Sequence, residues 1–284
     1  ALVRRFPEID LVVGGHEHYP ITSIQGRTLI SKAGSDARFL ARIDLNRRRD
    51  TTVERFYELM PVNNTIPDEP KAAAVIAGYE ERLGRELDVV VGRSTVALEA
   101  NSAIMRASET NLGNLVADAM RAEVGADITI ANSGGIRGDR AYPAGPLARR
   151  TLVAMLPFGS VVCKLEMTGR DILAALESGV GRLPASDGRF PQVSGLTMTV
   201  SRSAPVGQRV SNVLIGGAPL DLAKTYSVAT TDYQVTGGDG YAIFTTQKQL
   251  VSHETGPMQV LALEKYVTAR GTVSPQTESR IVVR

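Results

Sequence analysis

Residues 111–137, NLGNLVADAMRAEVGADITIANSGGIR, place a helical pattern directly before a strand pattern. The first part has apolar side chains at helical spacing and ends on Gly125, a residue type that commonly closes helices in the left-handed conformation. Residues 127–132, DITIAN, are the short apolar run typical of a buried strand. The two glycines of NSGGIR then allow a tight turn that leaves Arg137 beside Asn132. This stretch therefore predicts a helix, a core strand and a polar turn in succession.

The chain beyond this stretch continues to alternate between helix and strand patterns, without a strict βαβ order. Residues 168–179, TGRDILAALESG, predict a helix with Thr168 at its cap, Asp171 three residues later and Gly179 past its end. Further patterns complete an α+β domain over residues 88–284: a half-buried strand in GLTMTVS (195–201), a late helix from about Pro257 and a closing strand in ESRIVVR (278–284).

The N-terminal part of the chain contains four short apolar or alternating runs, separated by glycine, aspartate and basic clusters. Such runs predict strands, and together they indicate the edge of a sheet domain. They are DLVVGG (10–15), RTLISKAG (27–34), FLARIDLN (39–46) and VERFYELM (53–60).

A helix is expected over residues 69–86, after the breakers of NNTIPDEP. Asp68 is its expected cap, and Pro70 lies in its first turn. Its apolar side chains recur at helical spacing, at Ala72, Ile76, Tyr79, Leu83 and Leu87. We therefore divide the chain into an N-terminal domain over residues 1–65, a linker helix over 66–87 and a C-terminal domain over 88–284.

Composition excludes several classes of protein. The 284 residues are 43% hydrophobic, enough for a substantial core. The formal charge is only +2, from 32 basic and 30 acidic side chains without long runs of either sign, so we expect no nucleic acid polymer as partner. Cys163 is the single cysteine, which excludes an intrachain disulfide and predicts a packed strand residue. No run reaches the roughly 18 apolar residues of a membrane span, and the N-terminus lacks a signal core.

Two of the three histidines lie close together, in GGHEHYP, residues 14–20. In an extended segment His16 and His18 would point to the same side, where both imidazoles could bind metal ions. The preceding strand pattern and glycine turn favour this interpretation, because catalytic residues of layered α/β enzymes tend to follow such strands. The alternative is a glycine-rich turn whose histidines face solvent.

The motifs resemble a known family. DLVVGGHEH is similar to the last metal-binding motif of calcineurin-like metallophosphoesterases. NLGNLVADAM, NSGGIR, LPFGS and GGDGY, in that order, resemble the C-terminal domain of bacterial and animal 5'-nucleotidases. The resemblance covers essentially the whole chain. It implies a mixed-sheet substrate-binding domain, preceded by the end of a sandwich-like metallophosphoesterase domain and a linker helix.

The resemblance also implies a set of substrate-binding residues in turns and loops. A guanidinium group suits bidentate contacts to phosphate or carboxylate. The matching positions for the pocket lining are Arg106, Asn132, Gly134 and Arg137. For each arginine the alternative is an ordinary solvated surface charge.

Two aromatic residues and one carboxylate complete the implied pocket. Phe158 in LPFGS and Tyr233 in TTDYQVTGGDGY match the family's two stacking aromatics, which would hold a base between them. Asp239 matches a carboxylate that accepts hydrogen bonds from ribose hydroxyls, as a carboxylate can do bidentately. The alternatives are two core aromatics and a turn aspartate. A tyrosine at position 233, where many relatives carry phenylalanine, keeps the stacking face and adds a hydroxyl.

The chain departs from the family in its metal ligands. The resemblance implies two divalent ions, zinc, manganese or similar, yet no Asp-x-His or Gly-Asn-His segment occurs. Two imidazoles cannot supply a two-metal hydrolytic centre, so we expect no complete catalytic site here. Because the sequence also begins at Ala1, we expect the C-terminal portion of a longer 5'-nucleotidase whose N-terminal catalytic domain is missing. This portion should bind nucleotide weakly and hydrolyse nothing.

Two other functions are open at this point. The chain could be a stand-alone nucleoside- or nucleotide-binding module, or a relative that acts on UDP-sugars, cyclic nucleotides or thiosulfate-derived substrates. The two aromatics favour a ligand with a base over thiosulfate. The resemblance further implies a periplasmic, secreted or cell-surface location.

Overall fold

A computed structural model describes residues 2–47 and 53–284 of the chain. Contacts divide it into two compact units, Ala1–Tyr79 and Glu80–Arg284. The division falls inside helix α2 (Pro70–Leu87). The helix predicted over residues 69–86 is thus confirmed, and each unit is described by itself below.

Within residues 2–47 and 53–79, the first unit contains five strands, of which the sequence predicted four. The missed strand is β2, whose two isoleucines lie three residues apart and break the alternation. In the sheet of order β1-β3-β2, β1 is parallel to β3 and β2 is antiparallel to it, while β4 and β5 form a hairpin. The elements are α1 (Leu2–Arg5), β1 (Leu11–Gly14), β2 (Pro20–Gln25), β3 (Thr28–Ala33), β4 (Phe39–Arg47) and β5 (Val53–Pro61).

Helix α2 differs from its prediction in its cap and in its burial. The Glu69 carboxylate, rather than Asp68, accepts a hydrogen bond from the backbone N–H of Ala72 at 2.7 Å. None of the side chains of α2 is buried, and Tyr79 is 58% exposed. The apolar spacing correctly indicated a helix, because it reflects the helical periodicity. It does not show whether other residues cover the apolar face.

The second unit is built on a five-stranded mixed sheet of order β12-β8-β16-β11-β17. Strands β8 and β16 are parallel, and the remaining neighbours are antiparallel. Every residue of β8 is buried, as its apolar run predicted. The strands are β8 (Ile128–Asn132), β11 (Val162–Thr168), β12 (Pro191–Ser194), β16 (Thr225–Thr231) and β17 (Lys248–Val251).

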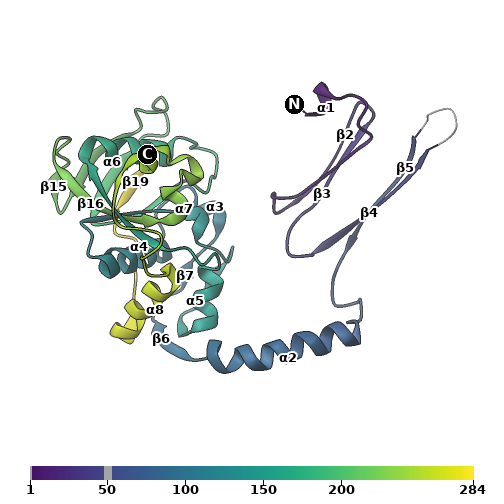
Figure 1. Cartoon of the computed structure of the whole chain (residues 1–284), viewed down its shortest axis with the longest axis horizontal. Coiled ribbons are helices and arrows are strands. Elements are labelled where there is room, and N and C mark those ends of the chain that lie inside the picture. The colour runs from purple at the N-terminus through teal and green to yellow at the C-terminus, as the bar shows by residue number, and fades with distance from the viewer. Residues whose placement is uncertain (1, 48–52) are drawn as a thin grey trace. The chain divides into compact units, whose positions relative to one another are not determined.

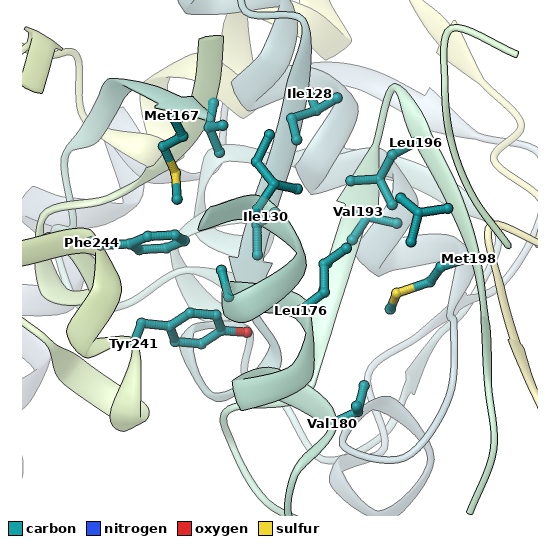
Figure 2. Close-up of a cluster of buried hydrophobic side chains, with 14 of the residues drawn as sticks. Ile128, Ile130, Met167, Leu176, Val180, Val193, Leu196, Met198, Tyr241 and Phe244 are labelled. Carbon is teal, nitrogen blue, oxygen red and sulfur yellow. The ribbon is translucent and has the colours of Figure 1, made fainter. Parts of the chain in front are cut away.

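Helices cover both faces of this sheet (Figure 1). Because successive side chains of a strand point to opposite faces, each strand contributes residues to both sides. Ile128 and Ile130 point into a core shared with α6 (Gly169–Val180). Figure 2 shows this cluster, in which Leu176 of α6 lies near Ile130 and Val193. Ala131 belongs instead to a second core with α4 (Asn111–Val124) and α8 (Gln259–Arg270). The three layers confirm the α+β prediction.

Smaller elements surround these layers. A four-stranded sheet has the order β15-β14-β13-β19, a three-stranded sheet the order β10-β6-β18, and β7 pairs with β9. Their bounds are β6 (Val90–Ser94), β7 (Leu98–Glu99), β9 (Ala141–Tyr142), β10 (Gly145–Ala148), β13 (Leu196–Val200), β14 (Val210–Ile215), β15 (Ala218–Pro219), β18 (Thr272–Val273) and β19 (Ile281–Val283). The short helices are α3 (Ser102–Met105), α5 (Arg149–Met155), α7 (Asp232–Val235), η1 (Ser133–Gly135), η2 (Gly238–Gly240) and η3 (Ala242–Thr246).

Helix α4 has the ends that its sequence requires. The Thr110 hydroxyl accepts a hydrogen bond from Gly113 N at 3.1 Å, and Gly125 closes the helix at φ +57°. Asn111 anchors the helix rather than capping it. Its side chain accepts from Glu99 N and donates to Ala97 O.

Helix α6 has the predicted cap, since Thr168 accepts a hydrogen bond from Asp171 N. Its predicted end was wrong, because Gly179 lies inside the helix and is buried. A Cβ at this position would lie 2.6 Å from the hydroxyl oxygen of Tyr241, which itself donates to Arg189 O. The glycine thus permits close packing against Tyr241.

Cys163 is buried in β11, as predicted. Burial raises the pKa of its thiol to about 11. Within the described part of the chain, no helix combines the length and apolarity needed to cross a bilayer.

We predict that Gly179→Ala destabilises the second unit by about 1–3 kcal/mol, because the methyl group overpacks Tyr241. Urea unfolding of the two proteins measures this difference. Gly78→Ala in α2 is the matched control, since an added Cβ there meets open space and alanine favours a helix interior. Equal stability of the two variants would contradict the packing role of Gly179.

Candidate functional site

The polar end of β8 is the centre of the candidate site. Asn132 ends this buried strand and precedes η1. Its side-chain nitrogen Nδ2 donates to Asp239 Oδ2 at 2.7 Å, and its backbone N–H donates to Gln234 Oε1 at 3.2 Å. The strand end is therefore bonded to residues about a hundred positions away, which makes Asn132 a fixed point of the site.

Asp239 receives hydrogen bonds on both of its carboxylate oxygens. Asn132 donates to Oδ2, and the Tyr233 hydroxyl donates to Oδ1 at 3.0 Å. Asp239 lies in η2 at φ +53°, a left-handed conformation that aspartate tolerates better than most residues. The Gly-Asp-Gly turn thus aims the carboxylate back at the end of β8.

Tyr233 presents a ring that is 49% exposed, while its hydroxyl is held by Asp239. Burial raises the pKa of this phenol, and the hydrogen bond to Asp239 and the carboxylate charge raise it further. The phenol is therefore held as a neutral donor. The interpretation of Tyr233 as a core aromatic is wrong, because the ring is half exposed.

Phe158 is also exposed, at 61%, in the loop after α5. The guanidinium carbon of Arg137 lies 5.3 Å from the centroid of its ring, a cation–π distance. The backbone N–H of Arg137 donates to Met155 O at 2.8 Å, which ties the end of NSGGIR to α5. Phe158 is thus a surface aromatic held beside a cation.

Two hydrogen bonds join the segments that carry the aromatic residues, the loop of Phe158 and helix α7 of Tyr233. Asp232 N donates to Val161 O at 3.0 Å, and Val161 N donates to Asp232 Oδ1 at 3.1 Å. Val161 follows Phe158 by three residues, and Asp232 directly precedes Tyr233. The structure therefore brings together two pairs, Arg137 with Phe158 and Tyr233 with Asp239, and it joins the second pair to Asn132.

Gly134 allows a close approach of two backbones. Its N–H donates to Gly188 O at 2.8 Å, and an added Cβ would lie 3.1 Å from both Gly188 Cα and Asp239 Oδ2. The loop around Gly188 was not predicted from the sequence. Its signal was the turn pattern Ser-Asp-Gly at residues 186–188, shortly after Pro184.

Arg106 is not part of this network. It follows α3 as its C-cap, and its backbone N–H donates to Ser102 O. Helix α3 packs against η1, so Arg106 follows an element that borders the site. Within residues 2–47 and 53–284, no contact joins its guanidinium group to the other predicted site residues.

His16 and His18 differ from the predicted geometry. Residues 16–19 form a bend, His16 has φ +76°, and both side chains are exposed. The same-side rule for extended segments therefore does not apply. Glu17 between them pairs with Lys32. In the described ranges, no group of three or more histidine, cysteine, aspartate or glutamate side chains could hold a metal ion. The residues present do not fit a complete dimetal site.

Comparisons with known proteins agree on one family. The family model described as 5'-nucleotidase, C-terminal domain, matches residues 90–246, more than half of the chain. A trifunctional nucleotide phosphoesterase (YfkN) of Bacillus subtilis is 29% identical over 99% of this chain, which covers 20% of that protein. A 5'-nucleotidase of Vibrio cholerae is 27% identical over 96% of this chain and 54% of its own length.

A solved structure supports the fold. The crystal structure of a 5'-nucleotidase precursor from Thermus thermophilus superimposes with a TM-score of 0.80 at 27% identity. The match covers 96% of this chain and 59% of that one. The chain thus spans about half the length of most of the relatives described here, and the mixed-sheet fold expected from the motifs is confirmed.

We predict that Asp239→Asn lowers the pKa of Tyr233 toward its ordinary value of about 10, because the variant removes the carboxylate charge beside the phenol. Burial remains, so the pKa should not fall below that value. Titration of ¹³Cζ-labelled tyrosine by NMR measures this change. Tyr266 is the control, since its raised pKa arises from burial and Asp118. An unchanged pKa at Tyr233 would refute the coupling.

Proposed function

Because the chain belongs to the 5'-nucleotidase C-terminal domain family, we propose that it is the nucleotide-binding part of a 5'-nucleotidase-like hydrolase. The single observation that carries the proposal is the contact network at the end of β8, in which Asn132 and Tyr233 hold Asp239. The names of the relatives, nucleotide phosphoesterase and 5'-nucleotidase, agree with it.

In this proposal Asp239 binds the ribose. An ionised carboxylate offers about four lone-pair sites, and the two hydrogen bonds from Asn132 and Tyr233 occupy two of them. Two acceptor sites are left, which suits the cis-diol of a ribose. The protein donors fix the carboxylate in advance, so its ordering costs little when the ligand binds.

The base stacks on Phe158 and Tyr233 in this proposal. Both aromatic residues are exposed, and the segments that carry them are joined through Val161 and Asp232. Stacking of a base on an aromatic side chain contributes about 1–3 kcal/mol and tolerates different bases. Arg137, beside Phe158, and Arg106 are the proposed cations for the phosphate.

Hydrolysis of the phosphate ester by a metal-activated water is proposed for the whole hydrolase. His16 and His18 would contribute two of the ligands for its divalent ions. These two histidines alone do not complete a metal centre. We therefore propose that the present chain binds nucleotides without hydrolysing them.

A second candidate is a stand-alone nucleoside-binding module. It is favoured by one observation: the contacts of Asn132, Tyr233 and Asp239 lie wholly within the second unit and involve neither His16 nor His18. Both candidates predict nucleoside binding that is unaffected by EDTA. They differ in whether the whole natural protein releases phosphate.

Export to the periplasm, the cell surface or the medium, as the resemblance implies, is also proposed. Fractionation of the source cells with an antibody against this chain tests it. Recovery of the protein only from the cytosol would contradict it.

We predict that the chain binds adenosine and AMP in calorimetric titration and that Phe158→Leu weakens this binding roughly tenfold or more, through loss of stacking. Phe56→Leu is the matched control. Phe56 is 49% exposed and lies beneath Arg42 at 5.5 Å, but it belongs to the first unit. Absence of heat with any nucleoside, or equal losses in both variants, would refute the site.

We predict that the chain releases no phosphate from AMP when supplied with Zn²⁺ or Mn²⁺, because its ligand set is incomplete. A colorimetric phosphate assay measures the release. Phosphate release that disappears in a His16→Ala, His18→Ala double variant would overturn this prediction.

A further inference from the structure

A hollow lies at the opposite end of β8 from the proposed nucleotide site. It has a volume of about 660 Å³ and is formed by the end of α4, the β12–β13 turn, and the C-terminal part of α8. It adjoins Gly125 and Ala126, which precede β8, whereas Asn132 ends that strand. A five-residue strand separates its two end residues by about 13 Å, so the hollow is distinct from the site described above.

Three charged side chains of this hollow neutralise one another in part. Arg280, only 9% exposed, forms a bidentate ion pair with Asp118 at 2.7 and 2.9 Å, and it also pairs with Glu278. Its Nη1 additionally donates to Val193 O. Ser194 donates a further hydrogen bond to Asp118. These groups form a structural cluster whose hydrogen-bonding capacity is largely used.

Arg121 and Arg270 also line the hollow, and neither has a carboxylate partner among the described residues. Three guanidinium groups therefore face two carboxylates, Asp118 and Glu278, which leaves one excess positive charge. Two guanidinium groups without a carboxylate partner, at one hollow whose lining carries an excess positive charge, indicate a place for an anion.

Both arginines are held in position by the fold. A Cβ added at Gly195 would lie 3.0 Å from Nη1 of Arg121, so this guanidinium packs directly on the glycine backbone. The guanidinium carbon of Arg270 lies 3.4 Å from the ring centroid of Tyr266, and its Nη1 donates to Tyr266 O. Such stacking orients a guanidinium group and leaves other N–H donors available.

We propose that this hollow is a second binding site, which takes a small organic anion that carries a phosphate or carboxylate group, with Arg121 and Arg270 as its binding cations. Its volume is within the range of small-molecule pockets and exceeds the need of an inorganic ion. The Arg280–Asp118–Glu278 cluster forms one wall. The proposal does not rest on the proposed nucleotide site, since the two share no residue.

The test is a titration of the whole chain, ¹⁵N-labelled, with sodium phosphate and separately with sodium succinate, followed by NMR. We expect saturable shifts at the amides of Gly195 and Gly216, and the tighter of the two ligands identifies the anion chemistry. Excess adenosine should leave these shifts intact. No saturable shifts, or shifts confined to Gly134 and Gly188 of the nucleotide site, would overturn the proposal.

Variants provide the second measurement. Arg121→Gln and Arg270→Gln should each weaken anion binding roughly tenfold, as expected for loss of one charge-assisted contact. Arg170→Gln, an exposed arginine outside the hollow, is the matched control and should bind like the parent. Equal weakening in all three variants would indicate nonspecific attraction and overturn the proposal. The titration of the parent chain remains decisive if a variant fails to fold.

Discussion

The candidate site depends on one interaction, the hydrogen bonds that hold the Asp239 carboxylate against the end of β8. Asn132 can provide its part because the strand before it is fully buried and therefore fixed. Tyr233 provides the other part from helix α7, whose first residue, Asp232, is bonded to Val161 in the segment after Phe158. A rigid core strand thus positions groups from a segment about a hundred residues away, as expected where a stable scaffold holds functional side chains.

The sequence predicted the elements that depend on local pattern. The strand DITIAN, the helix that ends at Gly125 and the cap at Thr168 formed as expected, because periodicity and capping are local properties. It failed where a distant contact decides the outcome. Gly179 lies inside α6, where Tyr241 packs closely against it, and the bend at His16 differs from the assumed extended geometry.

The candidate site residues show the same contrast between local motifs and distant contacts. Motifs identified Asn132, Arg137, Phe158, Tyr233 and Asp239, and the structure brings these side chains into linked pairs. No local pattern reported that Gly188 lies against Gly134, or that Arg106 stays outside the network. Contacts between backbones more than fifty residues apart leave only a turn signature in the sequence. Motifs therefore identify candidate site residues better than they predict which of these residues contact one another.

The most direct test of the central claim is a crystal structure of this chain with AMP. We expect the adenine between the rings of Phe158 and Tyr233, and the ribose hydroxyls within hydrogen-bond distance of Asp239. Density for the nucleotide at any other place, or rings of Phe158 and Tyr233 that contact no part of it, would refute this binding site.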